Sequence, residues 1–108
     1  MSTINRTNGG TATATSGAAT LNNRFGKVTS ESLSTAAGAL YTLTITNSQI
    51  SATDQVMASV GYGTANAGTP NVARVEPANG SLVIVIQNIH GSAALNGTIK
   101  VAYASFPA

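Results

Sequence analysis

The acidic side chains of this chain could act as general acids or bases only if two of them came together. Glu31, Asp54 and Glu76 are the three carboxylates. A carboxylate pair performs acid–base catalysis when both groups reach the reacting atoms. The three fall in different predicted elements, and no local spacing unites any two. Glu76 follows Arg74 by two positions on one strand face, so we predict an ion pair there.

The single histidine, His90, lacks the surroundings of a catalytic or metal-binding histidine. A catalytic histidine needs a nucleophile and an orienting acid, and a metal site needs further ligands. No serine lies in a G-x-S-x-G elbow. We predict instead that His90 bonds to the backbone or to a neighbouring chain. Gly61, Gly63 and Gly68 superficially match a phosphate-binding loop, but a strand follows them, not a helix.

These patterns predict no enzymatic activity, no cofactor and no metal site. The chain has no cysteine, which excludes disulfides and thiolate metal sites. Its basic residues are dispersed and form no run, so we predict no nucleic-acid partner. Arginine makes planar, bidentate contacts and is enriched at protein interfaces, so we predict that Arg24 and Arg74 contact a partner.

The elements that must position these side chains are β-strands. Tyr41, Leu43 and Ile45 alternate with three threonines, and successive side chains of a strand face opposite sides of its sheet. The same logic predicts strands near residues 11–15, 18–22, 25–33, 40–46, 56–62, 72–77, 82–87 and 98–106. Asn79-Gly80 predicts a tight hairpin with positive φ at both positions. The chain is therefore predicted to be all-β, a jelly-roll-like sandwich or barrel of about eight strands.

The chain divides into a predicted extended N-terminal arm, residues 1–17, and a β domain, residues 18–108. The arm is either a disordered terminus or a segment laid on a neighbouring subunit. In the second case Asn5 and Arg6 contact that partner. The start of the chain lacks the apolar segment of a signal peptide, and no apolar run approaches the ~20 residues that cross a bilayer. We expect synthesis in a cytoplasm and no membrane partner.

Charged residues make up only 7% of the chain, against roughly 25% in an ordinary domain. Mixed surface charge keeps small domains soluble, so we infer that other subunits cover much of the surface. Thr42, Thr44 and Thr46 occupy positions where lysine or glutamate would be common. They are predicted partner contacts, and the alternative is a simple exposed, threonine-rich sheet.

Several segments resemble small structural proteins of tailed bacteriophages. They are residues 19–22, 26–38, 41–47 and 80–97, and the resemblance extends over residues 18–106. It implies a capsid decoration, or cement, protein: a jelly-roll-like domain on the outer surface of the phage head, where it binds the major capsid protein and stabilises the shell. It also implies a homo-oligomer, with a trimer favoured over a dimer. The family has no fixed contact motif, so no residue role is carried over.

Two other functions stay open. A receptor- or glycan-binding module of a phage fibre or tail would share the all-β architecture and the Tyr- and Asn-bearing loops, although the long shaft usual in such chains is missing. A small hydrolase has less support, because the ionisable groups form no catalytic constellation.

Overall fold

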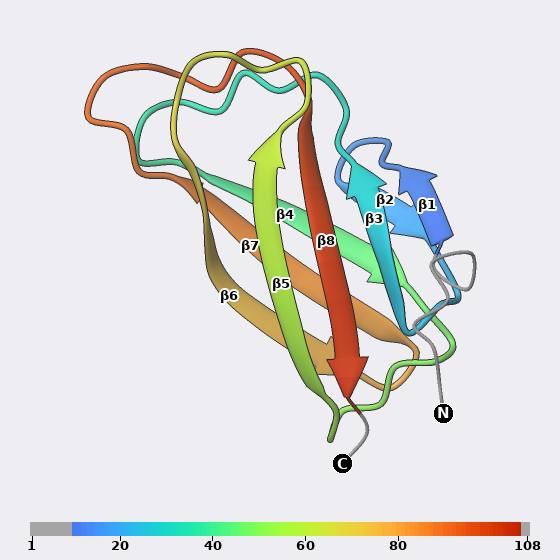
Figure 1. Cartoon of the computed structure of the whole chain (residues 1–108). Helices are drawn as coiled ribbons and strands as arrows, with labels where there is room; N and C mark the ends of the chain where they lie inside the picture. The colour runs from blue at the N-terminus through green and yellow to red at the C-terminus, as the bar shows by residue number, and fades with distance from the viewer. Residues whose placement is uncertain (1–9, 107–108) are drawn as a thin grey trace, which may run out of the picture.

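The protein is a sandwich of two β-sheets (Figure 1). The structure is a computed structural model that describes residues 10–106. No helix occurs among these residues, and the predicted all-β fold is confirmed. The strands are β1 (Gly10–Thr13), β2 (Ala18–Thr20), β3 (Phe25–Thr29), β4 (Leu40–Thr46), β5 (Gln55–Tyr62), β6 (Pro70–Ala78), β7 (Ser81–Asn88) and β8 (Ile99–Phe106).

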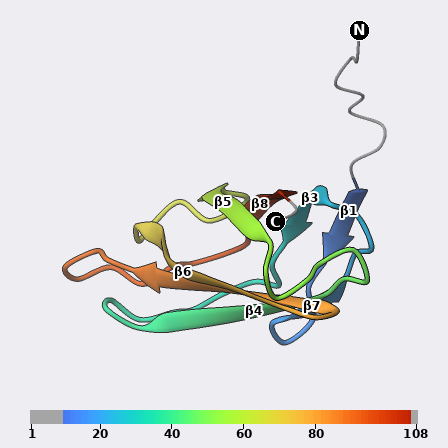
Figure 2. The ribbon, with the colours of Figure 1, turned by 90° about the horizontal axis from the view of Figure 1, so that it is seen from below.

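Each sheet contains four strands. Sheet A has the order β1-β3-β8-β5 and sheet B the order β2-β4-β7-β6. Figure 2 shows the two layers from below, with β5, β8, β3 and β1 over β6, β7 and β4. The pairs β1–β3 and β2–β4 are parallel, and the other pairs are antiparallel. A jelly roll is built from antiparallel strands, so that finer connectivity stays a prediction.

The core lies between the sheets and follows the period-two pattern. Along β4 the inward residues Tyr41, Leu43 and Ile45 are buried, while the alternating threonines are exposed. Sheet A contributes Val28 and Val101 from the facing side. Burial of an aliphatic side chain of this size stabilises the fold by roughly 1.5–3 kcal/mol. Burial of these inward-facing side chains is therefore the main source of the stability of the fold.

Three long loops meet at one end of the sandwich, at the top of Figure 1. They connect β3 to β4, β5 to β6, and β7 to β8, and Asn88 joins them. Its side-chain Nδ2 donates to the carbonyls of Thr35 and Ala93, at 3.0 and 2.8 Å. Its Oδ1 accepts from the amides of Thr69 and His90, at 2.9 and 3.1 Å. One buried amide thus uses its full hydrogen-bonding capacity to fix all three loops.

The strand predicted over residues 25–33 ends earlier, at Thr29. The hydroxyl of Ser30 donates to the carbonyl of Glu31 at 2.7 Å and accepts from the amide of Ile99 at 3.0 Å. A serine side chain that takes a backbone amide competes with the strand ladder. The amide of Ser30 still donates to the carbonyl of Ile99 at 2.9 Å, and the ladder between β3 and β8 ends at this bond.

The predicted hairpin of β6 and β7 is present, with Ala78 paired to Ser81. Gly80 has φ of 84°, but Asn79 does not have positive φ, so that part of the prediction is wrong. Hydrogen bonds to the loop between β4 and β5 hold the turn. Asn79 Oδ1 accepts from the amide of Ala52 at 3.0 Å, and Gly80 donates to the carbonyl of Ile50 at 3.0 Å.

The strand expected near residues 11–15 is present as β1, which pairs with β3 of the same domain. Ala14 follows it and is buried in the core at 2% exposure. The remainder of the predicted arm, residues 1–9 with Asn5 and Arg6, lies outside the described residues.

Candidate protein-binding face

Large apolar side chains gather on the outer side of sheet A. Met57 is 64% exposed, Phe106 51% and Phe25 36%. Ala104 of β8 pairs with Phe25 on one side and with Met57 on the other. Phe106 lies two residues further along β8, on the same side of the sheet. We name the set Phe25, Met57, Ala102, Ala104 and Phe106 the apolar face.

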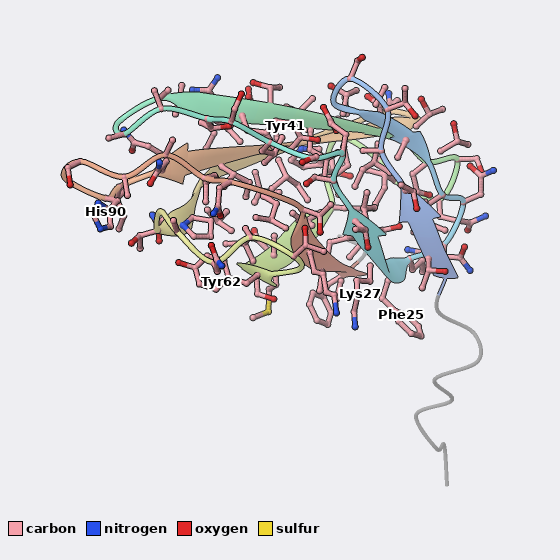
Figure 3. All side chains as sticks on the ribbon, turned by 90° about the horizontal axis from the view of Figure 1, so that it is seen from above. Phe25, Lys27, Tyr41, Tyr62 and His90 are labelled. Atoms are coloured by element: carbon pink, nitrogen blue, oxygen red, sulfur yellow. The ribbon has the colours of Figure 1, made fainter. Side chains whose placement is uncertain are left out.

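The apolar face is concave. Ala102 and Ala104 have small side chains and form the floor of a shallow groove of about 620 Å³, whose walls include Phe25 and Met57. Lys27 and Ser59, which both pair with Ala102, continue the walls. Figure 3 shows Phe25 and Lys27 pointing away from the sandwich on the same side. Contiguous exposed apolar patches on small proteins commonly mark sites of protein interaction.

The exposed charged residues beside the apolar face are positive, whereas Asp54, which directly precedes β5, is buried. Lys27 and Lys100 are exposed residues of β3 and β8, and Arg24 directly precedes Phe25. The strands of sheet A contain no aspartate or glutamate. The one ion pair within residues 10–106 lies on the other sheet. A complementary partner would therefore have apolar groups at its centre and carboxylates at its rim.

The contacts predicted on sheet B lie together on its outer face. Thr42 and Arg74 pair with Val85 from opposite sides, and Val85 is only 1% exposed. Thr44 and Thr46 continue the same exposed row along β4. Arg24 is not part of this group, because it adjoins sheet A. The roles of these residues in binding stay predictions.

The predicted ion pair between Arg74 and Glu76 is confirmed. Arg74 Nε lies 2.8 Å from Glu76 Oε1, and the side chains are 63% and 56% exposed. An exposed pair of this kind contributes about 0–1 kcal/mol, because water screens both charges.

The other two carboxylates also have partners, in separate parts of the fold. Glu31 accepts from the Tyr41 hydroxyl at 2.8 Å. Asp54 accepts from the Ser51 amide and from the Ser105 hydroxyl, both at 3.0 Å. Within the described part of the chain, no three acidic, histidine or cysteine side chains are arranged to hold a metal ion.

His90 lies in the exposed loop between β7 and β8. Its Nδ1 accepts from the amides of Ser92 and Ala93, at 3.0 and 2.8 Å. The imidazole therefore closes a local turn, and this use of Nδ1 confirms the prediction that His90 bonds to the backbone.

Tyr41 and Tyr103 are buried, whereas Tyr62 is 48% exposed. Tyr62 ends β5, and its hydroxyl donates to the carbonyl of Gly68 in the following loop. Burial raises the pKa of Tyr103 to about 12, although a hydrogen bond from Asn47 opposes the rise. Burial also raises the pKa of Tyr41 well above its ordinary value, and its hydrogen bond to Glu31 and the negative charge of that carboxylate raise it further.

Sequence reasoning missed the apolar face, although a signal for it was present. Val56, Ala58, Val60 and Tyr62 alternate along the predicted strand as one apolar face, and this alternation leaves Met57 on the outer side of the same strand. The same phase argument applied to Val101 and Tyr103 places Phe106 on the outer side of β8. Large apolar residues in the outward phase were the signal.

No helix in the described part of the chain has the length and apolar character to cross a membrane. Comparison with protein-family models, with curated proteins and with solved structures finds no match.

Proposed function

We propose that this chain is a structural protein of a bacteriophage particle, which binds the major capsid protein on the outer surface of the head and stabilises the assembled shell. The apolar face carries the proposal. Met57, Phe25 and Phe106 are exposed at the surface of a chain that has few charges to oppose association. Aromatic residues and methionine are enriched at the buried centres of protein interfaces.

The proposed action requires no chemistry. A protein that binds the assembled lattice, and not the separate subunits, stabilises the lattice by its binding free energy. At a free concentration one hundred times its Kd, this amounts to about 2.7 kcal/mol for each site. Glu31, Asp54 and Glu76 support a role without catalysis, because each has a separate hydrogen-bonding partner in a different place.

The charges suggest which capsid surface would fit. Lys27 and Lys100 lie on sheet A without a carboxylate in its strands. A capsid surface with acidic side chains around an apolar centre would be complementary. The association should therefore weaken as salt is raised, since partly exposed charge pairs are screened.

The experiment is co-sedimentation of the purified full chain with undecorated shells. The wild-type protein should pellet with shells at micromolar concentration, and Met57→Lys should weaken this binding by at least about tenfold. Leu40→Lys is the matched control, because Leu40 is 54% exposed on the outer side of sheet B. Failure of the wild-type protein to pellet would contradict the proposal, and so would equal losses in the two variants.

A second candidate is a glycan- or receptor-binding module of a fibre or tail, and Tyr62 favours it. Its half-exposed ring lines a small hollow of about 230 Å³ with Val60, Gly61, Thr69 and Pro70. Aromatic rings with a polar tip suit sugar binding, but the hollow is smaller than the roughly 300 Å³ of a typical ligand pocket. A glycan array would support this function if it gave signals that Tyr62→Ala removed.

A further inference from the structure

The four edge strands of the sandwich differ in how their open edges are protected. Proteins protect an edge by keeping its strand short or by placing proline, charge or a bulge in it. β1 and β2 have only four and three residues. β6 contains Pro70 and Pro77, an irregularity between Val72 and Arg74, and the ion pair of Arg74. β5 has eight residues with regular pairing, no charge and no proline, so it is the unprotected edge.

The hydrogen-bonding phase of β5 shows which of its backbone groups are free. Gly63 donates to the carbonyl of Thr98 at 2.9 Å, in continuation of the β5–β8 ladder. In an antiparallel ladder, residues that bond to the neighbouring strand alternate with residues whose amide and carbonyl point away. The residues whose groups point away from β8 are Val56, Ala58, Val60 and Tyr62. In the described part of the chain, their main-chain groups have no partner outside sheet A. Figure 1 shows β5 as the outer strand of the front sheet.

We propose that β5 pairs antiparallel with β5 of a second copy of this chain, about a two-fold axis at Ser59. Val56 would then lie opposite Tyr62 of the second copy, and Ala58 opposite Val60. Each of these pairs makes two hydrogen bonds, and all four edge-facing residues are used. A register centred on Ala58 would leave Tyr62 unpaired. The two copies of sheet A would form one continuous sheet.

The side chains of β5 suit pairing with itself. A two-fold axis brings the residues close to it near their own copies, so any charge there would face a like charge. β5 has none. Ser59 would face Ser59, which is small, and Met57 would lie opposite Gly61 of the second copy, where the surrounding space is open. The pairing would also bring the two apolar faces side by side, which raises avidity for a repeated partner.

This inference does not depend on the proposed function, and its test is the solution mass of the full chain. The wild-type protein should have the mass of a dimer. Ser59→Lys and Ser59→Glu should each be monomeric, because like charges would lie directly opposite each other. An equal mixture of the two variants should restore dimers that contain one copy of each, as native mass spectrometry would show. Leu40→Lys, an exposed change on the outer side of sheet B, should remain dimeric.

Cross-linking tests the register separately, because the natural chain contains no cysteine. Ser59 would form a non-hydrogen-bonded pair with its own copy, with a Cα separation of about 4.5 Å that a disulfide can bridge. Ser59→Cys should cross-link in oxidising buffer, whereas Leu40→Cys should not. The proposal is overturned if the wild-type protein stays monomeric up to millimolar concentration. It is also overturned if the protein is an oligomer whose mass is the same in Ser59→Lys and Ser59→Glu as in the wild type. Thermal unfolding of each variant separates loss of pairing from loss of fold.

Discussion

The side-chain amide of Asn47 donates a 3.0 Å hydrogen bond to the hydroxyl of Tyr103, and this bond joins the two sheets. Asn47 follows β4 of sheet B, and Tyr103 belongs to β8 of sheet A. Asn88, at the end of β7, binds the loops at the other end of the sandwich. Both amides are completely buried. A buried asparagine therefore stands at the C-terminal end of each central strand of sheet B, β4 and β7, and its hydrogen bonds hold the neighbouring segments in place.

Replacement of Asn47 by alanine should destabilise the fold by about 2–3 kcal/mol. Its Nδ2 also donates to the carbonyl of Asn23 at 2.7 Å, and its Oδ1 accepts from the amide of Gln49 at 2.9 Å. The variant would leave that amide without its side-chain partner. Urea unfolding measures the loss. Asn22→Ala is the control, because Asn22 is exposed and its Oδ1 accepts one bond, from Ser48; a loss as large there would contradict the argument.

Asn88→Asp keeps the side-chain shape but changes its hydrogen bonding. A carboxylate oxygen would face the carbonyls of Thr35 and Ala93, which now accept from Nδ2. We expect a loss of about 3 kcal/mol near neutral pH. The repulsion would raise the pKa of the new carboxyl above its ordinary value of about 3.9. The loss should therefore shrink as the pH falls and the protonated carboxyl donates one bond. Unfolding curves at neutral and acidic pH check this, and a pH-independent difference would contradict it.

The strand pattern could be predicted because it is local. Apolar and polar residues alternate in a half-buried strand, and the sequence shows this alternation directly. It correctly places Tyr41, Leu43 and Ile45 toward the core. The Asn79-Gly80 hairpin was also local, but in the fold the side chain of Asn79 accepts a hydrogen bond from the amide of Ala52, which lies in a loop distant in sequence. The presence of the strands could be predicted from residues that are close in sequence, whereas the backbone geometry of this turn could not.

The grouping of the apolar face from three strands and the position of the sheet edges could not be predicted in the same way, although strand phase indicates which single residues face outward. Phe25 and Phe106 are residue types that usually lie in a core. They come together on one surface only because β8 pairs with β3 on one side and with β5 on the other. The open edge of β5 is defined only by the strand order of sheet A. Strand order depends on contacts between distant segments, as the parallel pairing of Gly10 with Gly26 illustrates.

That glycine pair gives a third prediction. A Cβ on Gly26 would lie 2.6 Å from Leu21 Cδ2 and 2.8 Å from the main-chain oxygen of Gly10, and the latter cannot move without shifting β1. Gly26→Ala should therefore destabilise the fold by about 1–3 kcal/mol. Gly61→Ala is the matched control in the same sheet, because no atom lies within 4 Å of the position of its Cβ. Thermal unfolding compares the two, and equal melting temperatures would refute the packing argument.

High pH should destabilise the protein through its buried tyrosines. The pKa of Tyr103 is about 12 in the folded chain, against about 10 when unfolded. The unfolded chain therefore loses its proton first, and the stability that is complete below pH 10 is lost as the pH rises toward 12. Between these values the free energy of unfolding should fall by up to about 1.4 kcal/mol per pH unit for Tyr103. Burial and Glu31 also raise the pKa of Tyr41, which adds to the same slope.

Urea unfolding between pH 8 and about 11 measures this slope. Tyr103→Phe should be less stable at pH 8 but have a shallower slope, and an unchanged slope would show that Tyr103 does not govern the alkaline transition.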